Sequence, residues 1–217
     1  MTMRRTAQGH HPLAARRHVT HHTGAVRPAA AYRQRGAAPQ RATSGFTAPE
    51  LWHEPLEDGR IRFLVKTAGP RFRHAVTVQE VRARLALLPP EFVAPLEVVQ
   101  FSPMTCKRKL FPCYGMQWGA NVYLYPIEES LVETYLRPPK PQQLVEAKMY
   151  GGVWSESNSE YLLTWTEQSI KDFYLNNVLI HEIGHVLDNR NTNPEKRERY
   201  ANWFATEYGF RASRGRR

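Results

Sequence analysis

The segment His181-Glu182-Ile183-Gly184-His185 has residue types and a spacing that could do chemistry. On an α-helix, residues four apart lie about 40° apart around the axis and one turn along it, so His181 and His185 point the same way and can reach one ion. Glu182 is offset by about 100°, which puts its carboxylate at the edge of that face. HExxH on a helix therefore predicts a Zn²⁺ site with two histidine ligands and a glutamate base.

Hydrolysis is the chemistry expected of such a site. Zinc lowers the pKa of its water and polarises a carbonyl, and Glu182 takes the proton and passes it to the leaving amine. The segment predicts a zinc metallopeptidase that hydrolyses peptide bonds by glutamate-assisted attack of a metal-bound water. The alternative is that two surface histidines match the pattern by chance in a chain with nine histidines.

A catalytic zinc normally has three protein ligands, so a third ligand is expected downstream. Metzincins carry glycine three residues and histidine six residues after the second histidine, and this chain has Asp188 and Asn191 there, which excludes that family. Asn193 and Pro194 suit the start of a second helix, and Gly209 its stop. Glu198 shares a flank of that helix with two small alanines, so it can face the first helix.

This arrangement resembles the gluzincins, in which a helix with an ExxxD or ExxAD pattern follows HExxH and supplies the third ligand. Glu198 matches that ligand, and Asn202 stands where many gluzincins have an aspartate that hydrogen-bonds a ligand histidine. The Trp203-Phe204-Ala205 ending is also similar to minimal gluzincins and to bacterial peptidases that cleave regulatory repressors. The resemblance runs from roughly Thr164 to Phe210.

The resemblance implies a Zn²⁺ ion held by His181, His185 and Glu198, with Glu182 as the general base and Asn202 supporting a ligand. The alternative third ligands are Glu195, Asp188 and Glu207. Asp188 fits a supporting role beside the site, and a salt bridge to a nearby arginine that pins the interhelical turn is favoured for it over metal binding.

The site needs a long helix to carry it. Thr164-Trp165-Thr166-Glu167 has the capping-box pattern, apolar residues then recur at helical spacing, and no proline follows until Pro194. Gly184 costs about 1 kcal/mol relative to alanine in a helix, so another segment is expected to approach the backbone there.

Strands are predicted at 61–66, 96–101, 121–125 and 161–163, and a helix from a capping box at Thr77 to Leu88. Residues 127–159 are expected to form a long, partly irregular insertion, either a flap or a surface excursion. In gluzincin-like folds an edge strand beside the motif helix pairs with the substrate. Val122, Tyr123 and Leu124 are the substrate-binding candidates, and an interior strand is the alternative.

The expected fold class is α+β and zincin-like, with a small mixed sheet packed on the motif helix and a second helix that carries the glutamate ligand. Residues 1–48 are expected to be a disordered basic tail, 49–210 the metallopeptidase domain, and 211–217 a basic C-terminal tail. The net charge of +10 lies in the tails, because residues 50–210 hold 18 basic and 20 acidic residues.

The expected partner is a protein or peptide substrate. The basic tails allow weak, non-specific nucleic-acid contact, and the alternative function is a catalytically silent zincin-like domain in a nucleic-acid-associated or regulatory protein. No membrane partner is predicted, and with no secretory signal a cytoplasmic location is expected. Cys106 and Cys113, seven residues apart, are expected to be free thiols rather than a disulfide.

Overall fold

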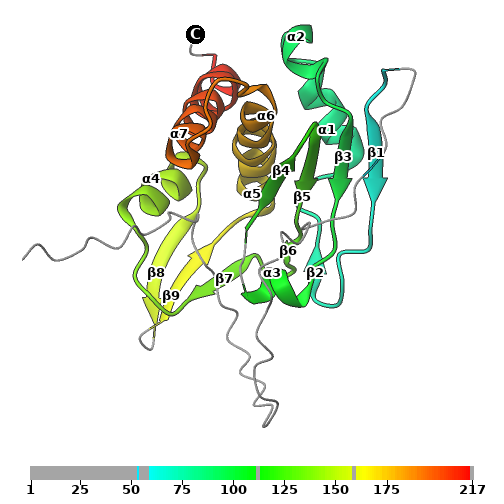
Figure 1. The fold of residues 1–217 in the computed structure, drawn as a ribbon. Coiled ribbons are helices and arrows are strands. Elements are labelled where there is room, and N and C mark those ends of the chain that lie inside the picture. The colour runs from blue at the N-terminus through cyan, green and yellow to red at the C-terminus, as the bar shows by residue number, and fades with distance from the viewer. Residues whose placement is uncertain (1–52, 54–58, 111–112, 158–159, 216–217) are drawn as a thin grey trace, which may run out of the picture.

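The computed structural model describes residue 53 and residues 59–110, 113–157 and 160–215 (Figure 1). The predicted tail 1–48 lies outside these residues. No helix in the described ranges is long and apolar enough to cross a membrane. The described chain is an α+β structure with three small sheets.

The largest sheet has four strands in the order β1 (Arg62–Val65), β3 (Val98–Phe101), β5 (Asn121–Leu124) and β4 (Gly115–Trp118). The first three are parallel, and β4 runs antiparallel to β5. Every residue of β3 and β5 is buried, which fits the apolar runs that predicted these strands. The sheet is therefore mixed, as expected.

The predicted first helix is confirmed as α1 (Val78–Leu85), and α2 (Pro90–Val93) is a single turn after it. Thr77 caps α1, since its hydroxyl accepts from the Glu80 N–H at 3.2 Å while the Glu80 carboxylate accepts from the Thr77 N–H at 2.8 Å. The predicted apolar stripe buries Val81, Leu85 and Leu88 in the core.

The region 127–159, predicted as a partly irregular insertion, holds more regular structure in its described part than that prediction suggested. This region contributes β6 (Ile127–Glu128), β7 (Val132–Tyr135), α4 (Pro141–Met149) and β8 (Val153–Ser157). A three-stranded antiparallel sheet forms in the order β7, β9 (Glu160–Thr164) and β8, and β6 pairs with β2 (Phe72–Arg73). Pro141 begins α4, where its missing N–H costs nothing. Most residues of β8 are exposed. The strand therefore needs no apolar face, and its sequence has no alternating pattern that would predict it.

The predicted long helix is confirmed as three continuous parts, α5 (Glu167–Phe173), the π-helical segment η1 (Tyr174–Val178) and α6 (Leu179–Leu187). Its cap lies two residues later than predicted, because Thr164 ends β9 and Thr166 accepts from the Ser169 N–H at 3.0 Å. Figure 1 shows α6 between the four-stranded sheet and the next helix. Outside this long helix, the short helix α3 (Cys106–Leu110) lies before β4 in the chain.

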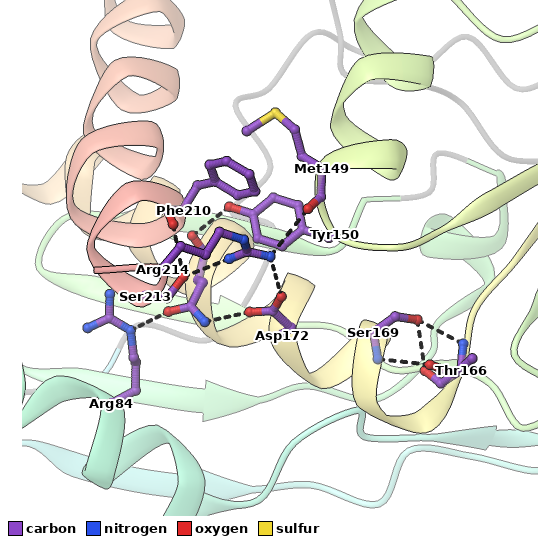
Figure 2. Close-up of polar contacts among 10 residues, drawn as sticks. Arg84, Met149, Tyr150, Thr166, Ser169, Asp172, Phe210, Ser213 and Arg214 are labelled. Carbon is purple, nitrogen blue, oxygen red and sulfur yellow. Dashed lines mark hydrogen bonds and ion pairs between the residues drawn. The ribbon is translucent and has the colours of Figure 1, made fainter. Parts of the chain in front are cut away.

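Asn193 caps the second helix, α7 (Pro194–Phe204), as predicted. The helix does not stop at Gly209 but continues as the π-helical segment η2 (Ala205–Arg211). The chain remains anchored beyond the predicted domain end at 210, because Arg214 forms an ion pair with Asp172 at 2.7 Å (Figure 2).

The two π-helical segments meet at Asn176 and Gly209. A Cβ atom on Gly209 would lie 1.8 Å from the Asn176 carbonyl oxygen, so only glycine allows this approach. Asn176 also accepts from Arg84 Nε at 2.6 Å and donates to Asp172 at 2.7 Å. Tyr150, which lies near Arg214 in Figure 2, donates to the Asn176 carbonyl at 2.9 Å. A short backbone contact and a polar network thus join η1 to η2.

We predict that Gly209→Ala destabilises the protein far more than Gly184→Ala. At Gly184 the nearest atom to an added Cβ is Ala201 Cα at 3.0 Å, which a small shift relieves, whereas the 1.8 Å approach at Gly209 requires the segments to separate. Overpacking costs about 1–3 kcal/mol or more, and alanine recovers about 1 kcal/mol of helix propensity. Urea unfolding of both variants measures the difference, and equal losses would contradict the proposed contact.

Candidate metal centre

His181 and His185 on α6 face Glu198 on α7, and their ligand atoms all lie within 4.8 Å of one another. The two Nε2 atoms are 3.1 Å apart. Glu198 Oε2 lies 3.5 Å from His181 Nε2, and Glu198 Oε1 lies 3.4 Å from His185 Nε2. The structure thus brings together the two motif histidines and the glutamate that the sequence selected as third ligand.

These spacings fit a tetrahedral ion. Zinc bonds to imidazole nitrogen and carboxylate oxygen are about 2.0–2.2 Å long, so two ligand atoms at the tetrahedral angle lie roughly 3.3–3.6 Å apart. Each histidine has one Glu198 oxygen within that range, Oε2 for His181 and Oε1 for His185, and the Nε2 pair is slightly closer. Two imidazoles and one carboxylate also form the donor set of known catalytic zinc sites with an open fourth position.

The Glu198 carboxylate and the histidines beside it affect each other's protonation. Burial lowers the pKa of His181, but the Glu198 carboxylate and neighbouring acids outweigh it, so the net pKa is raised. Hydrogen bonds from His181 and His185 hold the pKa of Glu198 well below its usual range. The carboxylate is therefore ionised at neutral pH, which is the state that coordinates a cation.

The missing side chain of Gly184 sets the distance between α6 and α7. An added Cβ would lie 3.0 Å from Ala201 Cα and 3.1 Å from Phe204 Cβ. Ala201 and Ala205 are at most 1% exposed, as expected of small residues at a helix crossing. The predicted close approach at Gly184 is confirmed, and it brings Glu198 within reach of both histidines.

Glu182 lies beside the three candidate ligands and is only 7% exposed. Burial raises the pKa of its carboxyl group, and the two histidines oppose that shift. The edge strand β4 packs against it, since a Cβ on Gly115 would lie 2.8 Å from Glu182 Oε1. Sequence reasoning missed Gly115, although a glycine inside a strand is a known sign of close approach.

Asp188 does not contribute to the ligand set. It is 4% exposed and accepts from the Asn191 N–H at 3.2 Å and from Asn191 Nδ2 at 2.9 Å, so it holds the turn between α6 and α7. Burial raises its pKa, but these hydrogen bonds outweigh it and the net pKa is lowered. Asp188 therefore holds the turn, but the predicted salt bridge is not among the described ion pairs, and backbone and amide groups make the hydrogen bonds in place of an arginine side chain.

The other predicted supporting contacts differ from expectation. Asn202 lines the cavity at the metal centre, but the described hydrogen bonds include none from its side chain to a ligand histidine. Among the described residues His185 Nδ1 is buried without a partner. The alternative ligands lie elsewhere, since Glu195 is exposed in the first turn of α7 and Glu207 pairs with Arg211 at 2.7 Å.

The prediction that 121–125 forms an edge strand is wrong. Strand β5 pairs with β3 on one side and β4 on the other, and Val122, Tyr123 and Leu124 are at most 1% exposed, so they cannot pair with a substrate backbone. The sequence of β4 lacks a β-branched run, and the two-residue turn at Gly119-Ala120 that joins it to β5 was overlooked. The alternative of an interior strand is confirmed.

A cavity of about 230 Å³ opens from the metal centre. His181, Glu182 and Glu198 line it, together with Glu128 on β6 and two acids from later in the chain, Glu133 on β7 and Glu146 on α4. Sequence reasoning missed both acids, because they lie in the region read as irregular and no local pattern marks them. They reach the site only through the fold of the second sheet.

Comparison with protein-family models, with curated proteins and with solved structures found no match to this chain.

We predict that Glu198→Ala lowers zinc affinity by more than about 100-fold. A loss of about 100-fold is the upper end of the range for removing a residue that only hydrogen-bonds a ligand, and removing a ligand itself should cost more. The matched control is Glu195→Ala, which removes an exposed carboxylate from the first turn of the same helix. Elemental analysis and competition with a chromogenic chelator measure stoichiometry and affinity. Equal affinity of the two variants would remove Glu198 from the ligand set.

We predict that the free energy of unfolding falls as the pH rises, because the buried Glu133 carboxyl loses its proton. Burial raises its pKa to about 7, against opposing hydrogen bonds from Trp165 and Tyr114. The folded state thus holds a proton that the unfolded chain releases near pH 4.5, so the associated stability is complete below that pH and is lost as the pH rises through about 7. The other groups facing the carboxyl are Tyr135 and Glu128.

The full loss of unfolding free energy from the titration of Glu133 is on the order of 3 kcal/mol. Urea unfolding of the wild type and of Glu133→Gln at pH 5 and pH 8 measures it as a difference, which removes the contribution of groups common to both proteins. The free energy of unfolding of Glu133→Gln should increase relative to that of the wild type as the pH rises. A difference that does not change with pH would show that Glu133 titrates normally.

Proposed function

We propose that this protein is a zinc-dependent metallopeptidase of the gluzincin type. The observation that carries the proposal is the spacing of His181, His185 and Glu198, which fits a tetrahedral ion, with the buried carboxylate of Glu182 beside them. The order of elements supports it, since a mixed sheet packs on the HExxH helix and the following helix carries the third ligand.

Each residue has a separate task in this reaction. When bound, Zn²⁺ would polarise the scissile carbonyl and lower the pKa of the attacking water. Glu182 accepts the proton of that water and delivers it to the leaving amine. Its burial supports this role, because a carboxylate with a raised pKa is a stronger base than an exposed one. The backbone of Gly115 limits the positions that the carboxylate can take.

Strand β4 is suited to bind an extended peptide. The Tyr125 N–H donates to the Tyr114 carbonyl at 2.9 Å, so in the antiparallel register the alternate residues Gly115 and Gln117 direct their backbone groups away from β5. Within the described part of the chain no further strand pairs with β4. A peptide added to this edge would pass beside Glu182, which Gly115 contacts.

The test is Glu182→Gln in the full-length, zinc-loaded protein, with fluorescent casein and a pool of internally quenched peptides as substrates. Loss of the base should lower kcat/KM by about 10²–10⁴-fold, while zinc stoichiometry stays unchanged because the three ligands are intact. Glu195→Gln is the control for a charge change on the neighbouring helix. Cleavage that Glu182→Gln leaves unchanged, or that survives full removal of zinc, would refute the mechanism.

A further inference from the structure

Beyond the metal centre the cavity has aromatic walls and acidic groups, a combination that the proposed hydrolysis does not need. The aromatic walls come from the three-stranded sheet, from the residue that follows β9 and from α5, and their ring centroids are 4.7 Å apart for Tyr135 and Trp154 and 4.9 Å apart for Trp165 and Phe173. Glu133 and Glu146 are the acids. We refer to these six residues as the aromatic-acidic pocket.

Glu133 is buried without a cationic partner. It is 7% exposed, and its carboxylate accepts from Trp165 Nε1 at 2.8 Å and from the Tyr114 hydroxyl at 2.9 Å. Both donors are neutral, and the described ion pairs include none to Glu133. A buried carboxylate without a counter-charge costs several kcal/mol, so the ionised form of Glu133 is unfavourable until a cation enters.

Glu146 connects the pocket to the metal centre. Its carboxylate accepts a hydrogen bond from Asn177, which lies one turn before His181 on the same continuous helix. Like Glu133, it has no lysine or arginine partner among the described ion pairs, and burial is the main cause of its raised pKa. Two acids therefore face one cavity, and one of them adjoins the catalytic residues.

Three basic residues line the cavity, Arg108, Lys109 and Lys140, and the described ion pairs join none of them to Glu133 or Glu146. Arg108 donates to the Tyr125 hydroxyl at 2.8 Å and to Cys113 Sγ at 3.0 Å, and its charge acts on Glu182 rather than on Glu133. Lys109 Nζ lies 5.4 Å from the ring centre of Phe72. Lys140 is exposed at the N-cap of α4.

We propose that the aromatic-acidic pocket binds a basic side chain, lysine or arginine, of the peptide substrate. This specificity rests on the proposed peptidase function. The aliphatic stem of either side chain would pack on the aromatic walls, the cationic head would gain cation–π contacts, and Glu133 and Glu146 would supply the counter-charge. A neutral side chain of the same length would fill the walls but leave both acids unpaired.

The first experiment measures binding without catalysis. Butylguanidinium, a mimic of the arginine side chain, and neutral pentan-1-ol are titrated into full-length, zinc-loaded protein, with tryptophan fluorescence as the readout because Trp154 and Trp165 line the pocket. The cation should bind at least about 10-fold more tightly than the alcohol, and Glu133→Gln should abolish that preference. Glu156→Gln, an exposed acid on β8, is the control and should retain it.

Equal binding of the two probes, or an unchanged preference in Glu133→Gln, would overturn the proposal. If Glu133→Gln fails to fold, Glu146→Gln decides, since its carboxylate faces the same cavity from α4. A reduced preference in that variant supports the pocket, and an unchanged preference overturns it.

The second experiment separates this inference from the proposed function. Internally quenched peptides that differ only by lysine, arginine, norleucine or glutamate at one position are scanned across the cleavage site. A preference in kcat/KM for the two basic peptides supports the pocket. Cleavage without that preference overturns the pocket and leaves the peptidase proposal intact. Cation binding that depends on Glu133, with no peptide cleaved, overturns the peptidase instead.

Discussion

Helices α6 and α7 come close enough to bring the candidate ligands His181, His185 and Glu198 together because Gly184 has no side chain. Ala201 and Phe204 occupy the space that a Cβ atom would need, at 3.0 and 3.1 Å. This contact sets the distance between the histidines on one helix and Glu198 on the other. A residue larger than alanine at Gly184 would force the helices further apart than the small shift that an alanine needs, and would move the carboxylate away from the imidazoles. The ligand geometry is therefore a consequence of helix packing.

Contacts at both ends of the helix pair maintain this arrangement. At one end Asp188 holds the short turn through hydrogen bonds to Asn191, and Asn193 caps the start of α7. At the other end the π-helical segments meet where Gly209 touches the carbonyl of Asn176. A π-helical turn places one extra residue in the helix, which rotates the residues after it relative to those before it. The segment η1 thus influences which face of α6 is directed toward the cavity.

Polar groups in the interior connect the fold to the site. Glu182, Glu133 and Glu146 all have pKa values raised mainly by burial, and each faces the same cavity. Burying three carboxyl groups around one cavity is costly for stability, and a protein retains such a feature where a metal ion, a water or a bound cation provides compensation. The cavity wall comes from β7, α4 and β9, so the second sheet forms part of the site.

The sequence by itself determined the motif helix, the glutamate on the next helix and the strands with long apolar runs. Each depends on local periodicity or on a cap, as at Thr77 and Asn193. The tertiary structure decided the rest. Only strand pairing made β4 the edge strand in place of β5, and only packing brought Gly115 against Glu182 and Glu133 into the cavity. The physical reason is that edge position and burial depend on neighbours distant in sequence, which leave no periodic signal in the segment itself.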